Sequence, residues 1–272
     1  MRSMMASAFV MAVLTAACAP AEDMSNSSDV SVSQNNEDRL AAAVAADTRT
    51  EENRVRDEFR NPAETLAFLG VEPDDMVVEI WPGGGWYSEI LAPYTQAEGS
   101  LALYASERGL GRMRAKAAAQ PDVYSNVLFS PADSPSDLGT VPAGSADVVL
   151  TFRNVHNWEM GDEPYGAQMF ATMYTMLRPG GTLGVVEHRL PEDRPDADMK
   201  TSGYMKQSTV VAMAEAAGFE LVDTSEVNAN PRDTADHEAG VWTLLPNLRT
   251  GDESKRAIGE SDRMTLRFRK PL

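Results

Sequence analysis

The chain has 272 residues, and its 41 acidic against 24 basic side chains give a formal net charge of −17. This charge excludes a cationic nucleic-acid binder as the leading interpretation, because a duplex requires a clustered Lys/Arg surface that neutralises phosphates. Hydrophobic residues at 43 % and charged residues at 24 % are typical of one globular domain with tails. The single cysteine excludes a disulfide framework and a multi-thiolate metal site, and the three histidines leave little material for a metal centre. We therefore expect no bound metal.

Residues 1–17 are predicted to be a secretory signal. Arg2 precedes an uncharged, mostly apolar run that is too short to cross a bilayer stably. The run ends in Leu-Thr-Ala-Ala-Cys, which resembles the bacterial lipobox, with Cys18 as the lipidated residue. Ala19 directly after it resembles lipoproteins that are released to the outer membrane. We predict a lipoprotein of the bacterial cell envelope on the periplasmic side, with soluble periplasmic secretion as the alternative.

Residues 18–38 are polar and rich in Ser and Asn, with almost no large apolar side chains. Such a segment cannot bury enough apolar surface to fold, so we predict a disordered tether. The remaining residues, 39–272, are predicted to form one domain.

The domain begins with a helical pattern over residues 40–69, which Gly70 closes. Within it, Asn61-Pro62-Ala63-Glu64 is typical of a capped helix start with proline in the first turn. A continuous apolar run over residues 76–80 predicts a strand, and Trp81-Pro82-Gly83-Gly84-Gly85 separates it from a helical stretch over residues 86–91. Strand, glycine loop and helix are the opening of a βαβ unit.

Further apolar runs alternate with helical or loop segments and bring the number of expected strands to seven. We predict an α/β, Rossmann-like sheet that is mostly parallel, with helices on both faces and a ligand beyond the carboxyl ends of the strands. Residues 228–261 are too polar and too broken by Pro and Gly for a crossover helix, so the last strand is expected to be antiparallel. The runs after the first strand are 101–105, 127–130, 147–152, 182–187, 219–227 and 264–268.

The glycine loop discriminates between two classes of ligand. A dinucleotide fingerprint requires a sixth-position glycine, but the spacing from Gly83 through Gly85 leads to Ser88. Glu79, just before the loop, would repel a pyrophosphate and would suit a ligand that carries a positive charge. A nicotinamide-dependent oxidoreductase is therefore a weak alternative.

The segment from Val78 to Gly85 resembles motif I of the class I S-adenosylmethionine-dependent methyltransferases. More narrowly, five separated segments in order resemble a bacterial group of exported methyltransferases, over roughly residues 50–272. These segments are EIWPGGGWYSEILAPY (79–94), TFRNVHNW (151–158), LRPGGTLGVVEHR (177–189), EAAGFELVDTSE (215–226) and SDRMTLRFRKP (261–271).

The resemblance implies S-adenosylmethionine as cofactor and assigns it residues. Glu79 would close the first strand, and Gly83 and Gly85 would pass under the methionine part. Glu107 is the candidate for the ribose, with a solvated surface charge as the alternative, because Ala105 stands near the position where the family has its acid and Ser106 and Glu107 lie just beyond it. The candidate for the adenine amino group is Asp133, with a helix N-cap as the alternative role. Trp81 stands where the family has its first glycine.

The resemblance also places the acceptor site after the fourth and fifth strands. Arg153, His156 and Asn157 follow the fourth, and His188 ends the fifth. A histidine takes a proton near neutral pH, and an amide can orient an acceptor. These four residues are the catalytic candidates. Tyr204 would cover the acceptor or simply pack.

The implied function is methyl transfer from S-adenosylmethionine to a small or envelope-derived acceptor. The expected partner is a small molecule, with no nucleic acid, and with membrane contact only through the lipid anchor on Cys18. The alternative is a catalytically silent, ligand-binding lipoprotein of the same fold. Trp81 in the glycine loop and the missing acid after the second strand favour that alternative.

Overall fold

The computed structural model describes residues 25–272, with side chains from residue 34 onward, and the compact unit Asn36–Leu272 holds the entire sheet. The predicted signal and Cys18 lie outside the described residues. Helix α1 (Ser25–Val44) begins inside the segment predicted as a disordered tether, and its Leu40 and Ala43 are buried. None of the helices described is both apolar and long enough to cross a bilayer.

The sheet has the order β3-β2-β1-β4-β5-β8-β7, with a short β6 paired to β5 beside it. All pairings are parallel except those of β8, which runs antiparallel to β5 and β7, as the sequence predicted. The predicted strands are all present, and only β6 is additional. The strands are β1 (Met76–Ile80), β2 (Ser100–Ala105), β3 (Val127–Pro131), β4 (Ala146–Phe152), β5 (Leu177–Leu190), β6 (Met205–Lys206), β7 (Glu220–Ser225) and β8 (Arg263–Arg269).

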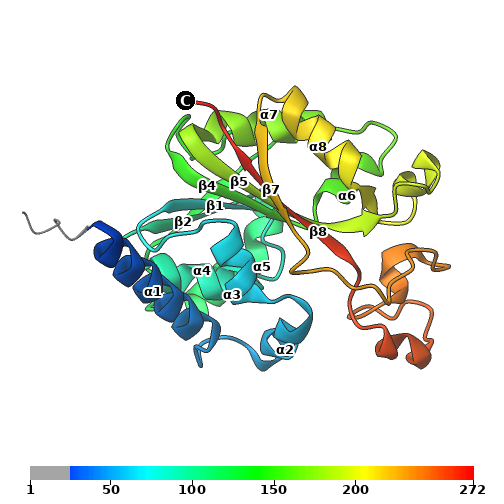
Figure 1. Cartoon of the computed structure of the whole chain (residues 1–272), viewed down its shortest axis with the longest axis horizontal. Coiled ribbons are helices and arrows are strands. Elements are labelled where there is room, and N and C mark those ends of the chain that lie inside the picture. The colour runs from blue at the N-terminus through cyan, green and yellow to red at the C-terminus, as the bar shows by residue number, and fades with distance from the viewer. Residues whose placement is uncertain (1–24) are drawn as a thin grey trace, which may run out of the picture. The chain divides into compact units, whose positions relative to one another are not determined.

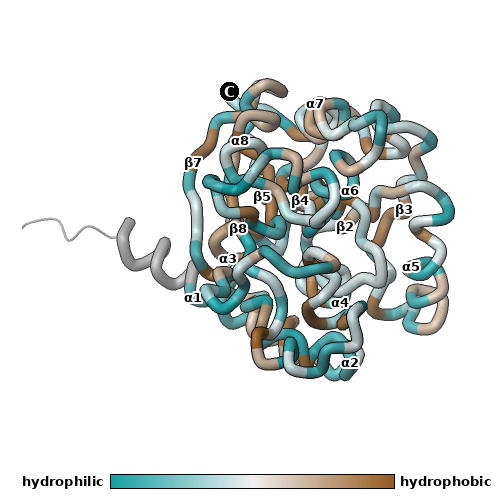
Figure 2. Tube along the Cα trace, turned by 90° about the vertical axis from the view of Figure 1, so that its right-hand side faces the viewer, coloured by the Kyte–Doolittle hydropathy of each residue, from teal (hydrophilic) through white to brown (hydrophobic). Residues whose placement is uncertain are grey.

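Helices cover both faces of the sheet (Figure 1). One face carries α3 (Pro62–Phe68), α4 (Ser88–Thr95) and α5 (Glu107–Ala119). The other carries α6 (Val155–Glu159), α7 (Gly166–Met176) and α8 (Gln207–Ala216). Each face has its own apolar cluster against the strands, and Figure 2 shows the apolar strands enclosed by more polar helices and loops. Burial on both faces explains why the central strands are continuous apolar runs instead of alternating ones.

The helical pattern predicted over residues 40–69 is interrupted in the structure. After α1 come α2 (Glu51–Arg54), a 3-10 turn η1 (Asp57–Phe59) and then α3. Asn61 precedes α3 in the left-handed region, with φ of 38°, and its amide donates to the carbonyl of Val227 at 2.6 Å instead of capping the helix. The predicted side-chain cap is therefore wrong, while the start of α3 at Pro62 is confirmed. These breaks turn Arg56 and Arg60 toward the sheet.

The connection between β7 and β8 is the predicted long loop, with only the 3-10 turns η3 (Gly240–Thr243) and η4 (Glu253–Ala257) in it. Figure 1 shows it in orange and red beyond one end of the sheet. Buried Asp233 holds it in place, because its carboxylate accepts from Tyr204 Oη, pairs with His237 and accepts from the backbone N–H of Asp262. Another 3-10 turn, η2 (Asp196–Lys200), follows β5.

Candidate functional site

Trp81, directly after β1, contributes to the walls of three neighbouring cavities that lie beyond the carboxyl ends of strands in the described chain. The β4 cavity, about 410 Å³, is lined by the glycine loop, by His156 after β4 and by Trp242 of the β7–β8 loop. The β2 cavity, about 310 Å³, includes Ala132, and the α5 cavity, about 520 Å³, includes Arg112. The strand order reverses between β1 and β4, which is where open α/β sheets bind ligands.

Glu79, the residue before the end of β1, is a buried carboxylate in the wall of the β4 cavity. The hydroxyl of Ser88, at the start of α4, donates to it at 2.5 Å. Burial raises the pKa of Glu79 to about 7, although the bond from Ser88 opposes that shift. A nearby positive charge would favour its ionised form, so the position suits a cationic ligand.

The glycine loop has open space beside Gly83 and tight packing beside Gly85. Gly83 has φ of +60° and open space where a side chain would stand, so a ligand can approach its backbone. Gly85 has φ of +82°, and a side chain there would collide with Met113 of α5. Glycine is therefore favoured for ligand approach at Gly83 and for packing against α5 at Gly85.

Trp81 occupies the left-handed region with φ of 52°, a conformation that glycine adopts without strain. Its ring packs edge-on against Trp158 at 6.0 Å and tilted against Tyr165 at 6.4 Å between centroids. The indole is thus a fixed wall between the β4 and β2 cavities.

The β2 cavity has mainly apolar walls, including Tyr104, Ala105 and Ala132, with Asp133 beside them. A flat, weakly polar ring suits such walls, and Asp133 is the one carboxylate among the described residues that line it. Ala105 ends β2 where an acid was sought, and the next residue, Ser106, uses its hydroxyl to cap α5 by accepting from Gly109 N–H at 3.1 Å.

Glu107 does not join these cavities. It lies in the first turn of α5, exposed, and pairs with Arg114 at 3.0 Å. The residues of the α5 cavity near the end of β2 are instead Ser106, Arg108 and Arg112, so the structure places cations where a ribose-binding carboxylate was expected.

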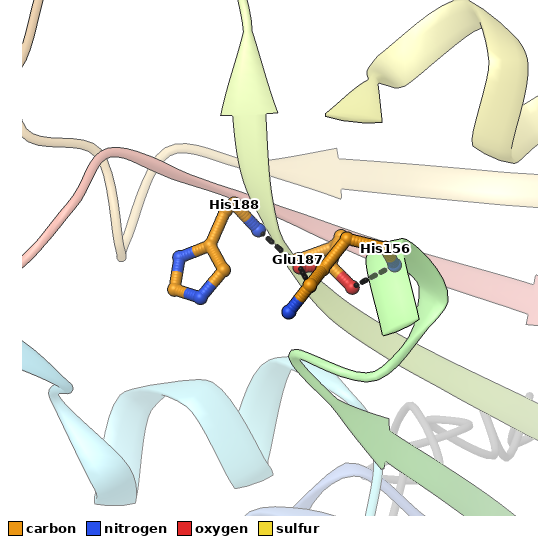
Figure 3. Close-up of side chains that lie close together, drawn as sticks. All are labelled: His156, Glu187 and His188. Carbon is orange, nitrogen blue, oxygen red and sulfur yellow. Dashed lines mark hydrogen bonds and ion pairs between the residues drawn. The ribbon is translucent and has the colours of Figure 1, made fainter. Parts of the chain in front are cut away.

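His156 and Glu187 form a buried pair (Figure 3). His156 lies in α6 just after β4, Glu187 lies in β5, and Nδ1 is 2.9 Å from Oε1. The same carboxylate accepts from the backbone N–H groups of His156, at 3.2 Å, and His188, at 2.7 Å. A carboxylate that holds Nδ1–H leaves Nε2 of His156 able to accept a proton, and that atom points away from Glu187 in Figure 3.

His188 lies beside this pair, with its ring centroid 5.2 Å from that of His156. Its Nδ1 is 2.5 Å from Ser261 Oγ, and its ring meets Tyr204 edge-on at 6.1 Å. Burial, together with positive charge on His156 and nearby arginines such as Arg263, lowers the pKa of His188 well below its ordinary value. This pKa shift favours the neutral form of His188. Tyr204 packs against the His188 ring, and its hydroxyl donates to Asp233 instead of facing a methyl acceptor.

Arg153 and Asn157 complete the predicted set in the wall of the β4 cavity. Arg153 has φ of 61°, and its guanidinium has no hydrogen bond or ion pair with the residues described. Burial and the neighbouring Arg263 lower the pKa of Arg153 to about 10. Asn157 is exposed, with its amide donating to the carbonyl of Arg153 at 3.3 Å. The structure thus brings His156, His188, Asn157 and Arg153 to one cavity.

His156, Glu187 and His188 also offer three potential metal-ligand atoms within 4.8 Å of one another. Sequence composition did not reveal this grouping. Arg153, Arg263 and Arg60 all act on His188 electrostatically, and their positive charge opposes a cation at this place.

A cluster of charged residues from both ends of the domain was not predicted from the sequence. Glu260, 2 % exposed, pairs with Arg56 at 2.5 Å, with Arg60 at 3.0 Å and with Arg263. Burial opposes its ionisation, but the three arginines hold the pKa of Glu260 well below its ordinary value. The only sequence signal was the antiparallel last strand, whose register sets Arg263 opposite His188.

No protein-family model and no curated protein matches the chain by sequence. Solved structures do match its fold. A SAM-dependent methyltransferase from Aquifex aeolicus is 16 % identical with a TM-score of 0.53, covering 64 % of this chain and 87 % of its own. CrArsM, an arsenic(III) S-adenosylmethionine methyltransferase from Chlamydomonas reinhardtii, is 15 % identical with a TM-score of 0.54, covering 86 % and 73 %.

The [4+2]-cyclase SpnF is 17 % identical with a TM-score of 0.57, and the match covers 89 % of this chain and 95 % of that one. At these identities the similarity establishes the fold. The chain therefore has the Rossmann-like α/β fold of the class I methyltransferases, with the mostly parallel sheet and antiparallel strand described above.

Proposed function

We propose that the chain is an S-adenosylmethionine-dependent methyltransferase that acts on a small molecule with an acidic X–H group. The observation that carries this proposal is one cavity lined by Glu79, by the glycine loop and by His156, whose Nδ1 is held by Glu187. Methyl transfer needs alignment, exclusion of water and a base, and no covalent nucleophile from the protein.

The walls fit S-adenosylmethionine in three respects. The β2 cavity would take the adenine between Ala132 and Trp81, with Asp133 near its amino group. Gly83 offers an open backbone to the methionine part, and Glu79 offers a buried carboxylate to its positive charge. The ribose contact differs from the family pattern, because Ser106 and arginines replace the usual acid.

S-adenosylmethionine would supply an electrophilic methyl carbon on its sulfonium. His156 would accept the proton of the acceptor at Nε2 as the methyl group is transferred. Glu187 acts as a positioning residue, because it holds Nδ1–H and stabilises the imidazolium that results. Trp242 and Trp81 line the same cavity and would limit water.

Binding of the cofactor is tested by calorimetry with S-adenosylmethionine, S-adenosylhomocysteine and methylthioadenosine, which lacks the amino-acid part. We expect Glu79→Gln to lower the affinity for S-adenosylmethionine about tenfold and to change the affinity for methylthioadenosine little. Asp75→Asn is the matched control, because Asp75 precedes the opposite end of β1 and burial raises its pKa to about 6. Absence of heat with both amino-acid-bearing compounds at millimolar concentration would refute cofactor use.

The base is tested with His156→Ala, which should lower transfer by roughly 10²- to 10⁴-fold and leave the affinity for S-adenosylhomocysteine within a few-fold. Glu187→Gln should lower turnover less and change its pH profile, since the carboxylate stabilises protonated His156. Unchanged turnover in His156→Ala would remove His156 from the mechanism.

A ligand-binding protein without transfer is the second candidate. Trp81 in the glycine loop and Ala105 at the end of β2 favour it. The neighbour SpnF, named as a [4+2]-cyclase, is a reminder that this fold is not tied to one reaction. Tight binding of S-adenosylmethionine with no transfer to a panel of small acceptors would favour this candidate.

We further propose that the protein belongs to the exported methyltransferase group and is a periplasm-facing lipoprotein anchored through Cys18. The segment Leu14–Cys18 supports this proposal. Intact mass spectrometry of the protein from its own envelope should show an N-terminal lipid on Cys18, and Cys18→Ala should abolish it. An unmodified, full-length N-terminus would contradict it, whereas cleavage without lipid would indicate soluble secretion.

A further inference from the structure

The β4 cavity carries an excess of positive charge, whereas the chain as a whole is strongly anionic. Five arginines line it against three glutamates, although the sequence carries 41 acidic and 24 basic residues. The arginines are Arg56, Arg60, Arg112, Arg153 and Arg263, and the glutamates are Glu52, Glu79 and Glu260.

Arg60 illustrates that the described residues do not supply enough hydrogen-bond acceptors for the arginines of this cavity. It is 2 % exposed, its Nε donates to Glu260 at 3.0 Å, and its guanidinium carbon lies 4.6 Å from the centre of the Trp86 ring. Its Nη1 and Nη2 have no hydrogen-bond partner among the described residues, and the same holds for Nη2 of Arg56 and Nε of Arg263. Buried donors without acceptors are costly, so N–H groups of this kind call for an acceptor from outside the protein, such as a ligand or an ordered water.

The balance of charges around Glu260 indicates whether that ligand is an anion or a cation. Glu260 is a single carboxylate among Arg56, Arg60 and Arg263. Arg153 adds a fourth cation, which Glu260 and Glu187 influence electrostatically without forming an ion pair with it. Burial and these mutual repulsions lower the pKa of Arg60 and of Arg153. An oxyanion would relieve the repulsion and accept the unused N–H groups, because guanidinium groups match carboxylate and phosphate oxygens in pairs.

The cationic wall adjoins the reaction centre. Arg263 is the register partner of His188, and Arg153 lies three residues before His156. Arg153 also follows β4 in the left-handed region, a strained conformation for a side chain other than glycine. At about 410 Å³ the cavity has the size of a small-molecule site.

We propose that Arg60, Arg153 and Arg263 bind an oxyanionic group, a carboxylate or phosphate, of the methyl acceptor. The acceptor is then a small organic acid whose X–H group reaches Nε2 of His156 while its anion lies on the arginines. This assignment to the acceptor rests on the proposed function, whereas anion binding by the cluster does not. The other source of the same chemistry is the carboxylate of the cofactor's methionine part.

The experiment titrates the protein with benzoate and with inorganic phosphate, both free and saturated with S-adenosylhomocysteine. We expect at least one of the two anions to bind the saturated protein. Arg60→Gln and Arg153→Gln should each weaken that binding by about 10- to 100-fold. Arg153→Gln guards against misfolding, because its side chain has no hydrogen bond or ion pair with the described residues. Arg269→Gln, an exposed arginine paired with Glu220, is the control and should bind as the wild type does.

The outcomes separate the two sources. An anion that binds the free protein but not the saturated one would assign the arginines to the cofactor's carboxylate and overturn the acceptor site. No anion binding to either form would overturn the proposal entirely. Anion binding that depends on Arg60 and Arg153, in a protein that does not bind S-adenosylhomocysteine, would keep the oxyanion site and refute methyl transfer.

Discussion

The β2 cavity and the β4 cavity, separated by Trp81, differ in both composition and origin. Walls of the β2 cavity are mostly apolar and come from residues directly after β2 and β3, together with Tyr165 and Met169. The β4 cavity is charged, and its Arg60–Glu260 pair joins positions 200 residues apart. The β2 cavity is built mainly at the ends of β2 and β3. The β4 cavity is built by the glycine loop and the ends of β4 and β5, together with segments that lie before β1 and after β7. The β4 cavity is therefore the one whose walls depend on contacts between segments remote in sequence.

The largest effect should follow removal of the carboxylate that holds the β4 cavity together. Glu260→Ala leaves buried arginines without their shared counter-charge, so the free energy of unfolding should fall by about 3–5 kcal/mol. Urea unfolding measures it. Glu253→Ala, which breaks the exposed pair with Arg256, should cost under about 1 kcal/mol. Equal, small losses in both variants would show that charge does not hold this side of the molecule.

Replacement of Glu79 should stabilise the protein at high pH, whereas replacement of Glu260 should destabilise it. Its pKa rises from 4.5 unfolded to about 7 folded, so its contribution to stability is present below pH 4.5 and is lost as the pH rises through 7. The free energy of unfolding that is lost in this way approaches about 3 kcal/mol above pH 7. Glu79→Gln should remove this part of the dependence and be the more stable protein at pH 8. Urea unfolding at pH 5 and pH 8 measures it.

A flat difference between wild type and Glu79→Gln across that pH range would contradict burial as the cause of the shift. Asp75 adds a pH dependence of the same sign in both proteins, because its pKa is also raised, so it cancels in the comparison.

Trp81 is the partition between the two cavities, and its removal tests whether the partition matters. Trp81→Gly relieves a left-handed backbone but removes the ring that meets Trp158 and Tyr165. We expect affinity for methylthioadenosine to fall about tenfold, whereas Trp81→Phe retains a wall and loses less. Calorimetry measures both. Tighter binding to Trp81→Gly would mean that the indole blocks the space assigned to the adenosyl group.

The sequence predicted the half of the site that local pattern can specify. Glu79, Gly83 and Gly85 lie within one strand–loop–helix unit, and the ends of neighbouring parallel strands brought His156 and His188 together as expected. The strand set, its antiparallel last member and the long loop were also predictable, because apolar runs and Pro/Gly breaks are local signals.

The charged half could not be predicted, for a physical reason. Arg56 and Arg60 lie within residues 40–69, which the sequence predicts as one helical pattern, but the structure breaks this stretch at α2 and η1 and pairs both arginines with Glu260. Glu260 lay in a polar loop whose path depends on contacts with Asp233. Glu107 stands just beyond the position where the resemblance places an acid, but in the first turn of α5 it pairs with Arg114 on the surface. Sequence separation hides such pairs from any window-based pattern.

The smallest effect is expected at Arg189, which tests whether proximity to His188 in sequence is enough to join the site. Arg189 directs its guanidinium to Glu226 and Asp262 at 2.7–2.8 Å, and these bonds raise its pKa. It lines a different cavity, with Leu190 and Gln207. Arg189→Gln should therefore lower the unfolding free energy by no more than about 1 kcal/mol and leave benzoate and phosphate binding unchanged. An anion affinity that fell as it does in Arg153→Gln would extend the cationic wall across β5, because two arginines on adjacent strand ends would then share one ligand.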